Sequence, residues 1–85
     1  MKFVFDPAKS AANKDKHGID FVDAQALWDD PDCPARSATE PRVQIIGRIT
    51  QTMGSAFVTV RHEDTIRIIS VRRARPDEEK LYRGA

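Results

Sequence analysis

The sequence predicts a small α+β domain with the order β-α-α-β(3-4)-α, in which the helices pack on one side of an antiparallel sheet. Two observations lead to this fold class. Apolar residues recur at helical spacing before residue 31, whereas after Pro41 they alternate with a period of two. Pro7 and Pro76 each stand where a proline opens the first turn of a helix, so one helix is expected before the strands and another after them.

The chain begins with a short strand and a helix. Residues 3–5 are apolar and suit an extended segment. Asp6-Pro7 then provides an N-cap followed by a proline at the first helical position, and Gly18 supplies the left-handed residue that ends the helix.

A second helix is expected from Asp20, where Asp23 completes a weak capping box. One face of this helix is apolar and should be buried in the core: it consists of Phe21, Ala24, Leu27 and Trp28. Residues 29–31 end the helix, and a loop with room for one short strand continues to Pro41.

Three strands of an antiparallel meander follow, over residues 43–49, 56–60 and 66–71. The first connection is expected to contain Gly54 as its turn residue, and the second is the polar segment 62–64. A final helix begins at Pro76, and its acidic first turn suits the positive end of the helix dipole.

Composition restricts the chain to one small domain spanning residues 1–85, with a thin core. No apolar run approaches the roughly 18 residues of a membrane span. The lone Cys33 excludes an internal disulfide, and the few histidines and cysteines lack zinc-site spacing. These features predict a cytoplasmic protein that needs no metal or other cofactor.

Charge and arginine placement suggest two surfaces. The first forty residues carry five basic and eight acidic side chains, a balance that suits a cationic partner. Arg67, Arg72 and Arg73 lie in or just after the last strand, where a rigid backbone would present guanidinium groups to a phosphate. Strict alternation places Arg67 and Arg73 on one face of the sheet and Arg72 on the other, so a bulge or a strand end is needed to bring them together. The alternative is that these arginines are solvated and pair with the acidic residues 77–79.

Two separated segments resemble the BrnT family of toxins from bacterial toxin–antitoxin pairs. The resemblance spans the chain and rests on residues in the right order and spacing: Phe5-Asp6-Pro7, Lys9, Asn13, Lys16-His17-Gly18-Ile19, Phe21, Ala24, Asp30-Pro31, Ile45-Ile46-Gly47, Arg67-Ile68-Ile69-Ser70, Arg72, Ala74, Glu78 and Tyr82. The sequence ends three residues after Tyr82, where BrnT relatives often continue, so a final helix is expected to be shortened or absent.

The resemblance implies a RelE-like ribonuclease fold and metal-independent RNA cleavage that inhibits translation. It also implies a ribbon-helix-helix antitoxin partner similar to BrnA. Because such antitoxins dimerise, we expect a complex with two copies of each chain, which contacts operator DNA only through the antitoxin.

RNA cleavage without a metal needs a base for the 2′-hydroxyl, an acid for the leaving 5′-oxygen, and cations around the phosphorane. The expected catalytic residues are Lys16, His17, Arg67, Arg72, Glu78 and Tyr82, with Arg67, Arg72 and Arg73 binding RNA phosphates. Glu78 and Tyr82 are four residues apart on the final helix and share a face. The alternative is that these residues have structural roles. Glu78 and His17 would then interact favourably with the dipoles of their helices, and Tyr82 would be an ordinary packing residue.

Two other functions remain compatible with the sequence. The chain could be a non-catalytic co-repressor that acts with its antitoxin on operator DNA. It could also be an accessory protein that binds ribosomal RNA without cutting it.

Overall fold

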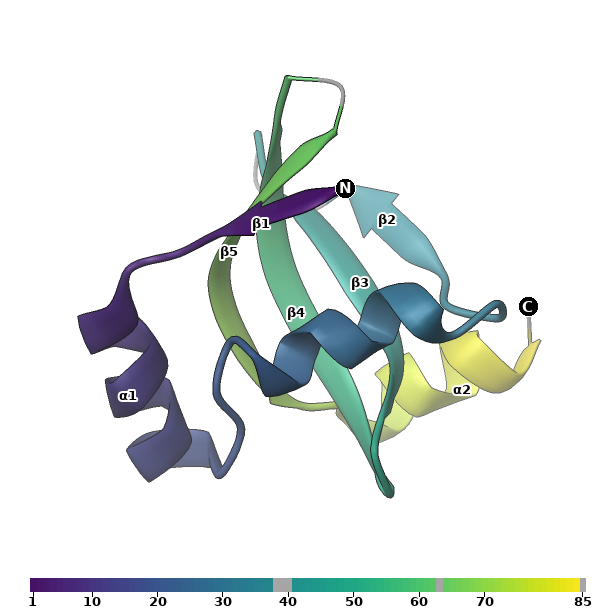
Figure 1. The fold of residues 1–85 in the computed structure, drawn as a ribbon. Coiled ribbons are helices and arrows are strands. Elements are labelled where there is room, and N and C mark those ends of the chain that lie inside the picture. Colours follow the sequence, from purple (N-terminus) through teal and green to yellow (C-terminus); the bar gives the residue numbers. More distant parts are fainter. Residues whose placement is uncertain (38–40, 63, 85) are drawn as a thin grey trace.

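The computed structural model describes residues 1–37, 41–62 and 64–84 of the chain. Within them, five strands form one sheet in the order β1-β5-β4-β3-β2 (Figure 1). The strands are β1 (Lys2–Val4), β2 (Ala35–Ser37), β3 (Val43–Ile49), β4 (Thr52–Arg61) and β5 (Thr65–Arg73). The helices are α1 (Pro7–His17), the 3₁₀ helix η1 (Asp23–Asp29) and α2 (Pro76–Gly84). The predicted α+β class and element order are confirmed.

The sheet is mixed rather than wholly antiparallel, which corrects the prediction. Strand β1 pairs with β5 in parallel, with Lys2 opposite Thr65 and Val4 opposite Arg67. The remaining pairings are antiparallel. A three-residue strand carries no sequence signal for its partner or direction, because both depend on a segment that lies 63 residues away.

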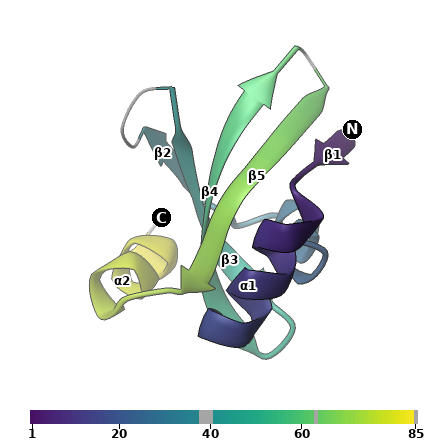
Figure 2. The ribbon, with the colours of Figure 1, turned by 90° about the vertical axis from the view of Figure 1, so that its left-hand side faces the viewer.

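The helices also cover both faces of the sheet, not one (Figure 2). The main core lies between the sheet and η1, and its buried members include Phe21, Leu27, Ile68 and Val71. Helix α2 packs on the opposite face, where its Glu78 contacts side chains of β3 and β5. Glu78 therefore lies against the sheet face that carries the polar residues of the strands, which the prediction left exposed to solvent.

Local signals set both ends of α1 as predicted, whereas the second helix begins three residues later than the predicted Asp20. The carboxylate of Asp6 accepts a hydrogen bond from Ala8 N at 2.9 Å, and Gly18 ends α1 with φ 75°. Asp20 and Asp23 exchange hydrogen bonds of 2.7 and 3.2 Å between side chain and backbone, which confirms the capping box. The helix that follows is 3₁₀ and begins at Asp23.

Asn13 fixes α1 against the sheet. Its Nδ2 donates to Ile19 O at 2.6 Å and to Val71 O at 2.7 Å. This side chain therefore ties the helix that carries Lys16 and His17 to the strand that carries the arginines.

The connection between β3 and β4 is tighter than predicted. Ile49 pairs directly with Thr52, so the turn consists of Thr50 and Gln51, and Thr50 has a positive φ of 56°. Gly54 is not the turn residue; it lies within β4 opposite Gly47. A Cβ at Gly54 would collide with the Ile49 side chain, so close packing explains this glycine.

A bulge in β5 changes which arginines share a face. Phe57 pairs with Ser70 but the next residue of β4, Val58, pairs with Ile68, so Ile69 has no partner in the ladder. Ile68 and Val71 both point into the core as a result. Arg67 and Arg72 therefore lie together on the opposite face, which strict alternation excluded.

The short strand β2 falls within the predicted loop, and residues 38–40 of that loop lie outside the described residues, as does residue 63 of the predicted second turn. No helix in the described ranges is both long and apolar enough to cross a membrane.

Candidate active site

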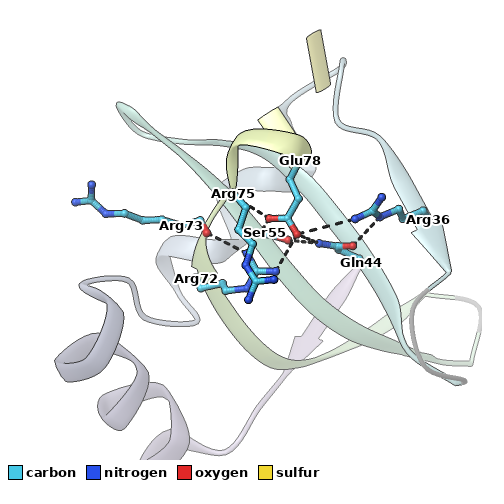
Figure 3. Close-up of polar contacts among 7 residues, drawn as sticks. All are labelled: Arg36, Gln44, Ser55, Arg72, Arg73, Arg75 and Glu78. Carbon is cyan, nitrogen blue, oxygen red and sulfur yellow. Dashed lines mark hydrogen bonds and ion pairs between the residues drawn. The ribbon is translucent and has the colours of Figure 1, made fainter. Parts of the chain in front are cut away.

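The candidate site lies on the sheet face under α2 and centres on an ion pair between Arg72 and Glu78 (Figure 3). Arg72 Nη1 and Nη2 donate to the two carboxylate oxygens of Glu78 at 2.7 and 2.8 Å, in a bidentate arrangement. Glu78 Oε1 also accepts from Arg75 N at 2.9 Å, which fixes the first turn of α2 in the manner of a capping box. Glu78 is only 3% exposed, so its geometry is set by the fold.

Gln44 connects this pair to a second arginine. Its Nε2 donates to Glu78 Oε2 and to Ser55 Oγ, both at 2.6 Å. Its Oε1 accepts from Arg36 Nε at 2.7 Å. Guanidinium groups from β2 and β5 thus approach one buried carboxylate from two sides (Figure 3).

The network keeps Glu78 ionised. The guanidinium of Arg72 outweighs the effect of burial and lowers the pKa of Glu78 from 4.5 to about 2. The same hydrogen bonds raise the pKa of Arg72. At neutral pH Glu78 is therefore a poor proton donor and a weak base, and it acts on Arg72 chiefly by holding its orientation.

Arg72 keeps donors for a ligand. Nη1 also donates to Arg73 O at 3.1 Å, so three of the five N–H groups of a guanidinium are used by the protein within the described part of the chain. The guanidinium carbon lies 5.4 Å from the ring centre of Phe57, which supports it from the sheet. The side chain is 22% exposed, so part of the guanidinium is open to solvent.

The predicted site residues fall into separate groups. Arg72 and Glu78 form the cluster under α2, whereas the Arg73 side chain points away from it (Figure 3). Arg67 lies on the same face of β5 as Arg72 but farther along the strand, opposite Thr59 where Arg72 is opposite Ser55. Arg73 and His17 line a pocket of about 260 Å³ between the end of α1 and the β3–β4 turn. Lys16 is exposed on α1.

Tyr82 shares a helix with Glu78 but has different partners. Its hydroxyl donates to Asp30 Oδ2 at 2.9 Å, and this hydrogen bond raises the pKa of the phenol. Asp30 also accepts from Arg48 N and Asp32 N at 3.0 Å, and its pKa is lowered mainly by the Arg48 bond. Tyr82 is thus a protonated phenol that fastens α2 to the segment after η1.

Sequence reasoning missed Arg36, Gln44, Ser55 and Phe57. A polar residue between the apolar residues of a predicted strand, as Gln44 is, was the available signal. Arg36 lay in a presumed loop and gave no signal. In the described ranges, no three or more His, Cys, Asp or Glu side chains are grouped so that they could hold a metal ion.

Comparisons with known proteins bear on the fold and the family. The model of a family described as "Ribonuclease toxin, BrnT, of type II toxin-antitoxin system" matches residues 5–78. The crystal structure of the Brucella abortus ribonuclease toxin BrnT is similar, with a TM-score of 0.75 and 23% sequence identity, over 88% of this chain and 97% of that chain. At this identity the structural similarity shows a shared fold. No curated protein matches the sequence.

Proposed function

The chain belongs to the BrnT family of ribonuclease toxins of type II toxin–antitoxin systems, and on this premise we propose that it cleaves RNA without a metal ion and thereby inhibits translation. The observation that carries the proposal is the bidentate Arg72–Glu78 pair, which holds a guanidinium with spare donors on a partly open sheet face. A fixed guanidinium stabilises the extra negative charge of a phosphorane without reorganisation.

In the proposed reaction the 2′-oxygen attacks the adjacent phosphorus and the 5′-oxygen leaves, which gives a 2′,3′-cyclic phosphate and a 5′-hydroxyl end. A base takes the 2′ proton and an acid protonates the 5′-oxygen. Arg72 binds the phosphorane oxygens, Glu78 orients Arg72, and Arg67, farther along the same face, binds another phosphate of the strand. Because Glu78 is ionised and hydrogen-bonded, proton transfer is assigned to other groups.

His17 and Tyr82 are the proposed proton-transfer groups, with Lys16 adding positive charge near His17. Arg73 shares a pocket with His17 and would bind a phosphate at the end of β5. The pocket that contains His17 and Arg73 is separate from the cluster around Arg72. An RNA strand that contacts both must therefore run past the end of β5. The proposed reaction also requires Tyr82 to exchange Asp30 for an RNA oxygen.

The proposed partner is a cytoplasmic, BrnA-like ribbon-helix-helix antitoxin in a complex with two copies of each chain, which would reach operator DNA through the antitoxin alone. The type II family supports the existence of an antitoxin. The exposed start of the η1 region supports this segment as the site of contact, because Val22 is 62% exposed and Asp20 and Asp23 are close to it in the chain.

The test is incubation of antitoxin-free protein with single-stranded RNA in EDTA, beside an Arg72→Ala variant and a sample with added antitoxin. We expect cleavage in EDTA, a large loss with Arg72→Ala, and inhibition by the antitoxin. Activity that disappears in EDTA and returns with zinc or magnesium would contradict the metal-free reaction. Intact RNA together with antitoxin and operator binding would instead support the non-catalytic co-repressor.

A further inference from the structure

Arg36 is held beside the Arg72–Glu78 pair, and we propose that it binds the phosphate of the nucleotide next to the cleaved linkage in single-stranded RNA. The inference rests on the proposed function and adds a binding subsite to it. Arg36 Nη2 lies 4.0 Å from Glu78 Oε2, the same oxygen that Arg72 Nη2 contacts at 2.8 Å. The two guanidinium groups are therefore neighbours on one face.

The orientation of Arg36 is set by Gln44. Glu78 is an acceptor, so the Gln44 carboxamide must turn its Nε2 toward Glu78 and leave Oε1 facing β2. That oxygen accepts the Nε–H of Arg36. Gln44 is 4% exposed and cannot rotate without breaking contacts to Glu78 and Ser55. The fold thus fixes the Nε end of the Arg36 guanidinium. Its terminal NH₂ groups remain accessible to solvent, since the side chain is 47% exposed.

The charges around Arg36 call for an anion. Arg72 makes both hydrogen bonds of a bidentate pair with Glu78, which neutralises that carboxylate. Arg36 approaches Glu78 only to 4.0 Å, so its positive charge is not balanced by that carboxylate. A phosphodiester oxygen supplies one negative charge and matches the open edge of the guanidinium.

A groove beside Arg36 has room for the rest of a nucleotide. It holds about 410 Å³ between β2 and α2, and its lining is Arg36, Asp77, Lys80, Leu81 and Gly84. Leu81 is 37% exposed and offers apolar surface to a ribose or base. Lys80 adds a second cation, while Asp77 opposes it. The ligand class is therefore one nucleotide of an extended RNA strand.

The test compares Arg36→Gln with Lys2→Gln, which removes one positive charge from β1 at the opposite edge of the sheet. Arg72→Gln serves as the reference for the proposed active site. Affinity is measured by fluorescence anisotropy with a fluorescein-labelled, mixed-sequence single-stranded RNA whose 2′-hydroxyls are methylated, so that it cannot be cleaved by 2′-oxygen attack. Melting temperatures establish that each variant is folded, and Arg36→Lys provides a second variant that keeps the charge.

We expect Arg36→Gln to weaken RNA binding roughly tenfold and to reduce the salt dependence by about 0.7 in the slope of log K against log salt, as loss of one phosphate contact predicts. Lys2→Gln should change affinity less than about twofold, and Arg36→Lys should lie between wild type and Arg36→Gln.

Wild-type RNA affinity in folded Arg36→Gln, with weakened binding in Arg72→Gln, would overturn the Arg36 subsite and leave the proposed function intact. Wild-type affinity in both variants would overturn both. Reduced affinity for the antitoxin with unchanged RNA affinity would show that Arg36 contacts protein instead and would also overturn the proposal.

Discussion

Replacing Glu78 with glutamine should remove the part of the acid sensitivity of this fold that arises from the Arg72–Glu78 pair. The pKa of Glu78 is about 2 in the folded protein and 4.5 as the ordinary value, mainly because of Arg72. This difference corresponds to about 3 kcal/mol of folding free energy. Because the folded-state pKa is the lower one, the stabilisation is complete above pH 4.5 and is lost as the pH falls toward 2.

The magnitude is large for a domain of this size, whose free energy of unfolding is expected to be roughly 5–15 kcal/mol. At pH 7, Glu78→Gln leaves a partly buried Arg72 without its anion and should destabilise the fold by about 3 kcal/mol or slightly more. Near pH 2 the wild-type carboxyl is itself half protonated, so the two proteins should differ much less.

Urea unfolding followed by circular dichroism between pH 2 and 7 measures both curves. Glu79→Gln is the matched control, because Glu79 is the next residue of α2 and forms only a 3.8 Å pair with the exposed Arg83. The control should follow the wild-type pH dependence. If Glu78→Gln loses as much free energy of unfolding between pH 5 and 2 as wild type does, the argument from the Arg72–Glu78 pair is refuted.

Three further outcomes follow from the same contacts. Arg67→Ala should lower RNA cleavage by about 10²-fold with little change in melting temperature, whereas Arg72→Ala should lower both, because it strands the buried Glu78; a folded Arg67→Ala that remains fully toxic would remove Arg67 from the site. Tyr82→Phe should reduce the free energy of unfolding measured by urea titration, since it deletes the hydrogen bond to Asp30; unchanged stability would mean that this contact does not fasten α2. Light scattering of the co-purified toxin and antitoxin should give a mass of two copies of each chain, and a stable one-to-one complex would contradict the predicted assembly.

The parts of the fold that the sequence predicts correctly are those set by neighbouring residues. Asp6, Pro7 and Gly18 determine the ends of α1 through contacts within the helix itself. The buried face of η1 follows from spacing, and the Asp20–Asp23 exchange involves residues three apart. Such local interactions exist whatever the rest of the chain does, which is why a single sequence suffices to infer them.

The errors arise where distant segments decide the outcome. Gly54 suits a turn by its own preference, but contact with Ile49 explains its place within the strand. The doubled Ile68-Ile69 breaks the alternation of apolar and polar residues, but only the pairing with β4 decides that Ile69 is left out of the ladder and that Arg67 and Arg72 share a face. Gln44 and Arg36 become site residues only because α2 places Glu78 above them. Arg72 and Glu78 could therefore be named from residue type and position, whereas their neighbours Arg36 and Gln44 could not.

The parallel pairing of β1 with β5 has a consequence for how the protein folds during its synthesis on the ribosome. Residues 2–4 are made 63 residues before their partners at 65–67, so the sheet stays open at this edge until β5 has been synthesised. Until α2 has also been made, Arg72 lacks the carboxylate of Glu78 that orients it. The proposed toxic activity therefore depends on segments that are made well after β1, and the antitoxin is needed only once those segments have folded.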